Sequence, residues 1–364
     1  MGACCSTESD GGADARLFNS KRSTADGSRP AQLVRFFFVG RGEAGKSTII
    51  KQMQKLCAQS AAAGSRQFRM FDENWRPVDD PFGEPLRRRY RLIIRQNVLK
   101  TISTLVQQAD HYGYPYANER LREMAREVTA SAGEQLADIF QKDVEFNREL
   151  ADKISTLWQD EQGPIRRAMH HRKDFFISDA TEYFLSRDKL LEVASSEYVP
   201  SVDDVIRVRD PTTGVADYNF GVHKMRMSMH DMGGQPVELG RLATYVQAWL
   251  EKARPGDSNF ILFVAALSDY NVQHSVHKDK TLLDEAVSLL KVLLDEPRLA
   301  RCGFLLFLNK RDMFETKLQL YGDFERYFGR YVAEPSKRLS RHLSVISRPA
   351  STIAGVKDSS PKLR

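Results

Sequence analysis

A glycine-rich segment near the start of the chain has the spacing of a phosphate-binding loop. Residues 40–47 read Gly-Arg-Gly-Glu-Ala-Gly-Lys-Ser and fit the pattern G-x-x-x-x-G-K-[ST] between an apolar run and a helical pattern. Glycines in such a loop let backbone N–H groups face phosphate oxygens, while Lys46 reaches the terminal phosphates and Ser47 offers its hydroxyl to Mg²⁺. The segment predicts a nucleotide-phosphate site, and by itself it leaves ATP and GTP open.

A second motif discriminates between the two bases. Asn309, Lys310 and Asp312 directly follow the apolar run Phe304–Leu308. A carboxylate at Asp312 can accept hydrogen bonds from both N1–H and the N2 amine of guanine, a pair of donors that adenine does not present. The motif therefore favours guanine, and an ATP-driven phosphate-loop enzyme is the disfavoured alternative.

Two further segments carry groups that phosphoryl transfer uses. Asp231 can hold Mg²⁺ through water, Gly234 can turn its N–H towards a γ-phosphate, and Gln235 can orient an attacking water. Residues 207–214 contain arginines, one of which can neutralise charge on the transferring group, and a threonine that can complete the Mg²⁺ shell. These segments add a means of hydrolysis to the predicted nucleotide site.

The elements that must position these motifs alternate between strands and helices. Apolar or alternating runs that read as strands are residues 33–39, 218–222, 224–230, 260–267 and 304–308, with a helical pattern at 282–294. This alternation predicts an α/β domain whose mostly parallel sheet is covered on both faces. From about residue 84 to 195 the apolar residues recur at helical spacing without a convincing strand, so we expect an all-helical insertion. Its first helix should bury the face that carries Leu86, Tyr90, Ile93, Ile94, Val98, Ile102 and Leu105, and further helices are expected at about 118–129, 133–140, 147–157 and 180–194.

The composition argues against several other classes. A net charge of +6 without a long Lys/Arg block suits an anionic membrane surface weakly and argues little for nucleic acid. The four cysteines have no disulfide or zinc spacing, which indicates a reducing compartment. The longest apolar runs are far shorter than the roughly 20 residues of a spanning helix. The sequence also lacks a signal-peptide pattern.

Taken together, the motifs resemble those of the α subunit of heterotrimeric G proteins. The likeness covers about residues 31–320 and includes residues 40–53, 204–214, 231–235, 266–270 and 309–312. It implies a Ras-like P-loop GTPase domain at 31–58 and 205–350, an inserted helical domain at 59–204, an N-terminal arm at 1–30 and a disordered tail at 351–364.

The resemblance implies a slow GTPase that binds GDP and GTP with Mg²⁺ and relays signals from a membrane receptor to effectors. Arg209 matches the catalytic arginine in cis and Gln235 the water-orienting glutamine, while Ser47 and Thr212 match the two Mg²⁺ hydroxyls. The other nucleotide-binding positions are Gly42, Glu43, Ala44, Gly45, Lys46, Thr48, Asp179, Arg207, Asp231, Gly234, Asn309, Lys310, Asp312 and Ile346. A cis-arginine enzyme of this type turns over at about 10⁻² per second, which makes the nucleotide a timer rather than a fuel.

The N-terminus predicts a membrane anchor. Residues 1–6 read Met-Gly-Ala-Cys-Cys-Ser and fit M-G-x-x-x-[ST], so Gly2 is a candidate for myristoylation and Cys4 and Cys5 for palmitoylation. Because one acyl chain holds a protein only marginally and two hold it firmly, we expect attachment to the cytoplasmic face of the plasma membrane.

The chain departs from the family at its partner surfaces. After Gln235, residues 236–242 keep only one Glu and one Arg of the family's run, and the N-terminal arm is a poor helix former, which counts against βγ binding. In place of the family's Thr-Cys-Ala strand and receptor-binding helix stand residues 342–347 and Pro349. Either receptor coupling is lost or unconventional, or the C-terminal sequence is wrong. The alternative function is a degenerate, GTP-binding scaffold without effective turnover or receptor coupling.

Overall fold

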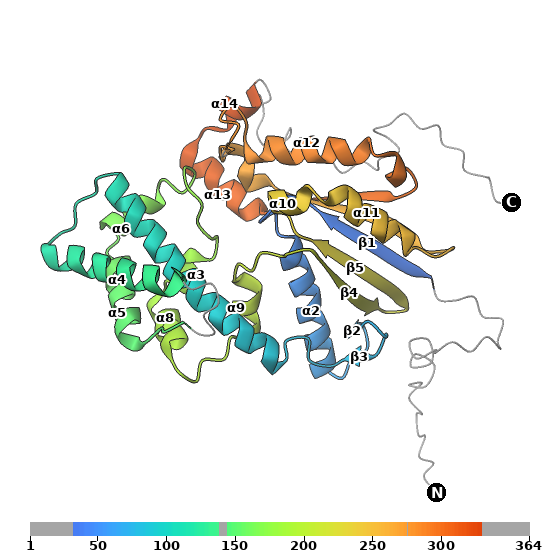
Figure 1. The fold of residues 1–364 in the computed structure, drawn as a ribbon, viewed down its shortest axis with the longest axis horizontal. Helices are drawn as coiled ribbons and strands as arrows, with labels where there is room; N and C mark the ends of the chain where they lie inside the picture. The colour runs from blue at the N-terminus through green and yellow to red at the C-terminus, as the bar shows by residue number, and fades with distance from the viewer. Residues whose placement is uncertain (1–31, 138–143, 275, 330–364) are drawn as a thin grey trace, which may run out of the picture. The chain divides into compact units, whose positions relative to one another are not determined.

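A seven-stranded sheet carries the motifs found in the sequence. The structure, a computed structural model, describes residues 32–137, 144–274 and 276–329. Among these residues the strands run in the order β3-β2-β4-β5-β1-β6-β7; Figure 1 labels the first five of them. Their bounds are β1 (Leu33–Val39), β2 (Phe68–Phe71), β3 (Pro77–Val78), β4 (Val215–Val222), β5 (Met225–Met232), β6 (Ser258–Ala266) and β7 (Gly303–Asn309). The sheet is mixed, because β5, β1, β6 and β7 run parallel whereas β4, β2 and β3 extend it antiparallel.

The chain divides into two compact units. The first contains the sheet and comprises the chain up to Pro81, Pro211–Ser268 and the chain from Ala286 onward; the second comprises Phe82–Asp210 and Asp269–Glu285. The helices of the first unit are α2 (Lys46–Ala62), α10 (Pro236–Leu239), α11 (Leu242–Glu251), α13 (Arg311–Tyr321) and α14 (Phe324–Phe328). Helix α12 (Leu282–Leu294) begins in the second unit and continues into the first.

Helices cover both faces of the sheet because successive side chains of a strand point to opposite sides. On one side Phe38 packs in a buried cluster with Ile50 and Cys57 of α2. On the other side Phe37 contacts Trp249 of α11, with ring centroids 5.3 Å apart. The strand β1 is therefore apolar throughout most of its length, as expected for a strand covered on both faces.

Polar groups lie on the α11 side of the sheet and are paired there. The guanidinium group of Arg35 donates to the carbonyl oxygen of Trp249 at 2.6 Å and lies over its ring. His230 Nδ1 lies 2.5 Å from Asp217 Oδ1 across the β4–β5 pair. Hydrogen bonds of this kind offset the desolvation of buried polar groups.

A β-hairpin that the sequence analysis did not predict extends the sheet beyond β4. Strand β2 pairs with both β3 and β4, and Phe68 and Met70 on β2 pack against the same apolar cluster as α2. Trp75 in the connecting turn has a φ of 59°, and its ring lies tilted against that of Phe71 with the centroids 5.6 Å apart. These residues lie inside the range 59–204 that the sequence analysis assigns to the helical insertion.

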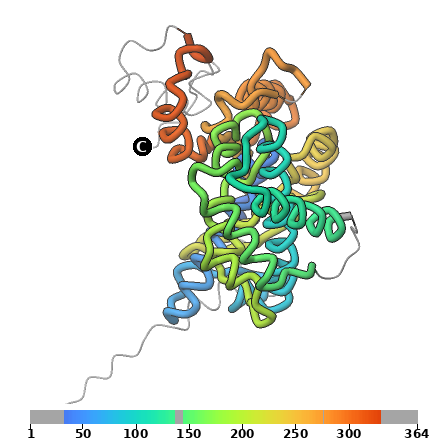
Figure 2. The backbone as a smooth tube through the Cα atoms, turned by 90° about the vertical axis from the view of Figure 1, so that its left-hand side faces the viewer, coloured from blue at the N-terminus to red at the C-terminus, as the bar shows by residue number. Residues whose placement is uncertain are grey.

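The second unit is helical, with no strand between residues 84 and 195 in its described parts. Its helices are α3 (Glu84–His111), α4 (Glu119–Ala137), α5 (Arg148–Gln159), α6 (Pro164–Met169), α7 (Thr181–Phe184), α8 (Arg187–Ala194) and α9 (Val202–Arg207); Figure 2 shows this part of the backbone wound as helical coils in cyan and green. The apolar face predicted for α3 is the buried face, with Tyr90, Ile94 and Val98 in the core. Two 3₁₀ turns complete the described elements, at Leu267–Asn271 and Pro297–Leu299.

Two predicted helix boundaries were wrong. Residues 118–129 and 133–140 were expected to be separate helices, but one helix, α4, continues through Gly133 to Ala137. The single helix expected at 180–194 is broken into α7 and α8, because Ser186 adopts an extended backbone and its hydroxyl donates to the carbonyl oxygen of Tyr183.

No helix within the described residues is both long enough and apolar enough to span a membrane.

Candidate nucleotide-binding site

The phosphate loop leaves β1 and enters α2 in a backbone shape that requires glycine. Gly45 has a φ of 100°, and a side-chain Cβ built on it would lie 2.1 Å from Nδ2 of Asn309. A Cβ on Gly40 would lie 2.2 Å from the carbonyl oxygen of Val264 on β6. A side chain at either position would clash, which explains why the first and last glycines of the motif, Gly40 and Gly45, must be glycine.

Asn309 joins the guanine motif to the phosphate loop. Its Nδ2 donates to the carbonyl oxygen of Ala44 at 2.9 Å, so the end of β7 and the loop after β1 are directly connected. Lys310 follows with a φ of 57° and forms the N-cap of α13, and Asp312 lies exposed in the first turn of that helix. The structure thus brings together two motifs that are about 265 residues apart.

Lys46 lies inside the loop. Its side chain is only 5% exposed, and Nζ donates to the carbonyl oxygens of Gly40 at 2.7 Å and Arg41 at 2.9 Å. Burial lowers the pKa of the Lys46 ammonium to about 8, although the carboxylate of Asp231 opposes the shift. The ammonium group is therefore poorly solvated and well placed to exchange carbonyl oxygens for phosphate oxygens.

The loop after β5 packs directly on the phosphate loop. The N–H of Gly42 donates to the carbonyl oxygen of Gly234 at 2.6 Å. A Cβ on Gly234 would lie 2.3 Å from Nζ of Lys46, and a Cβ on Gly42 would lie 2.6 Å from Nε2 of Gln235. Gln235, the N-cap of α10, therefore has its amide against the phosphate loop.

Three oxygen ligands from separate segments converge beside Lys46. Ser47 Oγ lies 2.7 Å from Thr212 Oγ1 and donates to Asp231 Oδ2 at 2.5 Å, and Thr212 also donates to this oxygen at 3.3 Å. The second carboxylate oxygen of Asp231 is buried and has no hydrogen-bond partner within the described residues.

This set of groups fits a hard divalent cation. Burial raises the pKa of the Asp231 carboxyl, opposed by the hydrogen bond from Ser47 and the charge of Lys46. A cation would relieve that cost and satisfy the buried oxygen, and hydroxyl and carboxylate oxygens are the ligands that Mg²⁺ prefers. No group of three or more His, Cys, Asp or Glu side chains in the described residues offers a different metal site.

Three other predicted site residues belong to the second unit. The Arg209 guanidinium lies 4.3 Å from the ring of Phe176, and that of Arg207 lies 4.7 Å from the ring of Tyr183. Asp179 is exposed and accepts a hydrogen bond from Arg172 at 3.3 Å.

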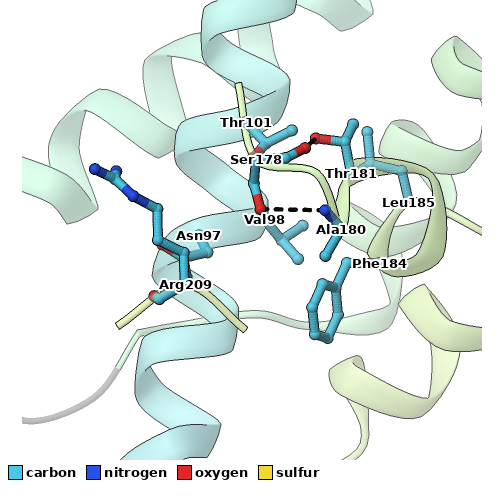
Figure 3. Close-up of a pocket in the computed structure, with 9 residues that line it drawn as sticks. All are labelled: Asn97, Val98, Thr101, Ser178, Ala180, Thr181, Phe184, Leu185 and Arg209. Atoms are coloured by element: carbon cyan, nitrogen blue, oxygen red, sulfur yellow. Dashed lines mark hydrogen bonds between the residues drawn. The ribbon is translucent and has the colours of Figure 1, made fainter. Parts of the chain in front are cut away.

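A small cavity in the second unit is lined by α3, α7 and the segments around them. It contains about 10 Å³, room for roughly one water molecule, so it is too small for a nucleotide. Figure 3 shows Arg209 at its rim, beside Asn97 and with its guanidinium directed away from Ser178 and Thr181. Asn97 and Phe176 are residues that sequence reasoning missed, since no local pattern links either of them to Arg209.

The other predicted site residues lie in the phosphate loop, at the start of α2 or outside the described residues. Glu43, with a φ of 67°, and buried Ala44 are part of the phosphate loop, and Thr48 lies in the first turn of α2. Ile346 and the lipidation candidates Gly2, Cys4 and Cys5 lie outside the described residues.

Comparison with known proteins places this chain in a family. A family model described as "G-protein alpha subunit" matches residues 17–350, which is most of the chain. The chain belongs to the G-protein alpha subunit family. Its fold is accordingly the expected one, a Ras-like α/β domain with a helical insertion.

One curated relative in this family is "Guanine nucleotide-binding protein subunit alpha-15" from Rattus norvegicus. It is 27% identical to this chain over 285 residues, which are 78% of this chain and 65% of the rat protein. The chain therefore spans slightly less than two thirds of the length of this alpha subunit.

Proposed function

We propose that this alpha-subunit family member binds GDP and GTP with Mg²⁺ and hydrolyses GTP slowly, as a membrane-attached signalling switch. The observation that carries the proposal is the convergence of Ser47, Thr212 and Asp231 beside Lys46. A buried lysine and a set of hard oxygen ligands suit a polyphosphate and its magnesium ion.

Each residue has a defined part in the proposed reaction. Ser47 and Thr212 hold Mg²⁺ directly and Asp231 holds it through water; the ion supplies positive charge to the phosphate oxygens. Lys46 binds the terminal phosphates through the donors that now contact loop carbonyl oxygens. Gln235 orients the attacking water.

Arg209 completes the proposed catalytic set. Its guanidinium neutralises charge that develops on the transferring phosphoryl group, the part an arginine in cis plays in slow GTPases of this type. The nucleotide then acts as a timer whose state is read by other proteins.

The base specificity proposed for the site depends on Asp312. Its carboxylate accepts from N1–H and the N2 amine of guanine, while Asn309 ties this motif to the phosphate loop through Ala44. ATP lacks the matching donors, so an ATP-driven reaction is the weaker proposal.

Binding and single-turnover hydrolysis test the proposal. Purified protein should bind a fluorescent GTP analogue in the presence of Mg²⁺, resist competition by ATP, and release phosphate at about 10⁻² per second. Arg209→Ala should slow hydrolysis by about 10³-fold or more, and Gln235→Leu should also abolish most turnover. Failure to bind GTP would overturn the proposal.

A scaffold that binds GTP without effective turnover is the second candidate. It is favoured by residues 236–242, where Pro236 follows Gln235 at once and starts α10. If the protein binds GTP in the same assay but does not hydrolyse it, and Arg209→Ala behaves like the wild type, the scaffold function is favoured.

The proposed location is the cytoplasmic face of the plasma membrane, through acyl chains on Gly2 and on Cys4 or Cys5. The proposed partners are a downstream effector, a G protein-coupled receptor and the βγ dimer; the departures after Gln235 and near the C-terminus weigh against the last two. Nucleic acid is not among the proposed partners.

A further inference from the structure

An aromatic ring lies directly under the side chain of the proposed catalytic arginine. The Cζ of Arg209 is 4.3 Å from the centroid of the Phe176 ring, well within the range of a cation–π contact. Both residues belong to the second unit, and Phe176 is 50% exposed. Because half of the Phe176 side chain is exposed, its ring contributes less to the core than a buried ring would, and one face of it is in contact with Arg209.

The main chain at Arg209 is fixed from three neighbouring positions. Val208 is buried, Asn97 Nδ2 donates to the carbonyl oxygen of Arg209 at 2.6 Å, and Arg89 donates to the carboxylate of Asp210 at 2.9 Å. Asn97 and Arg89 both lie on α3, the longest helix of the unit. The backbone of this segment is therefore held against a rigid element.

The helix that precedes Arg209 is anchored as well. Ser201 and Asp204 form a capping box at the N-terminus of α9. The fully buried carboxylate of Asp204 also accepts hydrogen bonds from Tyr183 at 2.7 Å and Tyr198 at 3.0 Å, and Lys189 Nζ lies 3.0 Å from it. Such a satisfied buried network keeps α9 in place.

The loop that carries Phe176 is held in place by neighbouring contacts. Ile177, next to Phe176, is buried, and the Thr181 hydroxyl donates to the carbonyl oxygen of Ser178 at 2.6 Å. In Figure 3 the Arg209 side chain extends away from Ser178 and Thr181. The main chain at Arg209 and the loop of Phe176 are both held in place, and the Phe176 ring restricts the side-chain torsions of Arg209.

We infer that Phe176 is a positioning residue for Arg209, which holds the guanidinium in a restricted set of conformations before GTP hydrolysis. This inference rests on the proposed function, because it requires Arg209 to act on GTP. A long side chain that is already restricted loses less conformational entropy when it is ordered in the transition state, so the activation free energy is lower. The ring thereby raises the hydrolysis rate without contacting nucleotide.

Substitutions that keep or remove the aromatic ring test the inference. Phe176→Leu keeps an apolar side chain but removes the π-face, whereas Phe176→Tyr keeps it; Phe175→Leu is the matched control at the neighbouring position. GTP hydrolysis is measured in single turnover and affinity with a non-hydrolysable GTP analogue. Phe176→Leu should slow hydrolysis about two- to fivefold at unchanged affinity, while Phe176→Tyr and Phe175→Leu keep the wild-type rate.

A double-mutant cycle separates positioning from a general structural effect. If Phe176 acts through Arg209, Phe176→Leu should have no further effect in an Arg209→Ala background. Equal slowing in both backgrounds, or a wild-type or faster rate in Phe176→Leu alone, overturns the inference.

The same data distinguish this inference from the proposed function. Loss of GTP binding or of hydrolysis in the wild type overturns both. A normal wild-type rate that depends on Arg209 but is indifferent to Phe176 overturns only the positioning role.

Discussion

The hydroxyl of Ser47 contacts both of the other oxygen-bearing side chains of the candidate site. It donates to Asp231 and lies beside Thr212, so the three groups hold one another in place. Its lone pairs remain available to a cation in the same position. If Mg²⁺ binds as proposed, these contacts already hold its ligands close together, which would reduce the cost of ordering them.

Ser47→Ala should remove the magnesium dependence of nucleotide affinity. Losing one oxygen that contacts the cation should weaken binding of a fluorescent GTP analogue about 10- to 100-fold with Mg²⁺, and little in excess EDTA. Thr156→Ala, which removes an exposed hydroxyl from α5, is the control. An equal loss with and without Mg²⁺ would contradict the assignment of Ser47 as a metal ligand.

The Asp217–His230 pair predicts a loss of stability in acid. The hydrogen bond with His230 is the main cause of the lowered pKa of the Asp217 carboxyl. A carboxyl whose pKa is lower in the folded state stabilises the fold above its unfolded pKa of about 3.9 and loses this effect as the pH falls through the folded value. Asp217→Asn should therefore lose less stability than wild type between about pH 5 and 3.

Urea unfolding at a series of pH values measures this difference. Asp295→Asn, at an exposed position after α12, is the matched control and should follow the wild-type pH dependence. Parallel curves for wild type and Asp217→Asn would show that the pair has no part in acid sensitivity.

At the scale of elements, the β2–β3 hairpin depends on Phe71. This side chain is 2% exposed and lies 5.6 Å from the Trp75 ring in the turn. Phe71→Ala should lower the free energy of unfolding by about 3–5 kcal/mol, because it removes a large buried ring and leaves a cavity. The same change at half-exposed Phe307 on β7 should cost less than about 1 kcal/mol in urea unfolding. A loss of less than about 1 kcal/mol in Phe71→Ala would mean that the ring of Phe71 is not packed in the core.

The packing of α2 on the sheet predicts that the thiol of Cys57 reacts slowly with alkylating reagents. Cys57 is buried in the cluster with Phe38 and Ile50, and burial raises its pKa to about 12. Iodoacetamide reacts with thiolate, so at pH 8 a variant with Cys57 as its sole cysteine should be alkylated at least about 100-fold more slowly when native than in urea. Mass spectrometry gives both rates, and comparable rates would indicate that α2 separates readily from the sheet.

At the scale of the whole molecule, the division between the two units falls between Asp210 and Pro211. Arg209 and Thr212 are only three residues apart. Nevertheless, Arg209 is held by α3 in the helical unit, whereas the hydroxyl of Thr212 contacts Ser47 in the unit that contains the sheet. In the proposed reaction, a change in one unit can therefore alter hydrolysis while leaving the magnesium ligands intact.

The proposed attachment to membranes depends on the first residues of the chain. In cells that acylate proteins, Gly2→Ala should move most of the protein from the membrane fraction to the supernatant, because one signal anchors weakly. Changing both Cys4 and Cys5 to Ser should have an intermediate effect. Fractionation measures both, and unchanged membrane association in Gly2→Ala would contradict the predicted anchor.

Features encoded in contiguous residues were predictable from the sequence. The strand β1, the loop at 40–47 and the guanine motif at 309–312 each combine an apolar run with glycine or polar residues at fixed spacing, and the structure confirms the strand and loop positions. The parallel order of β1, β6 and β7 follows from the helices between them.

Features that depend on contacts between distant residues could not be predicted from the sequence. Strand β2 has four residues, and besides the two-residue β3 its partner in the sheet is β4, about 150 residues later. The contact of Arg209 with Phe176 and the bond from Asn97 likewise join positions without a shared pattern. The helix α4 continues through Gly133, where a separate helix was expected to begin.

The hairpin also decides how other chains can approach the sheet. It occupies the hydrogen-bonding edge of β4, and its own outer strand, β3, has two residues, one of which is Pro77, which has no N–H to donate. An incoming strand finds almost no ladder of free donors and acceptors on that side. Recognition by strand addition is therefore blocked there, and a partner must read the side chains of helices and loops instead.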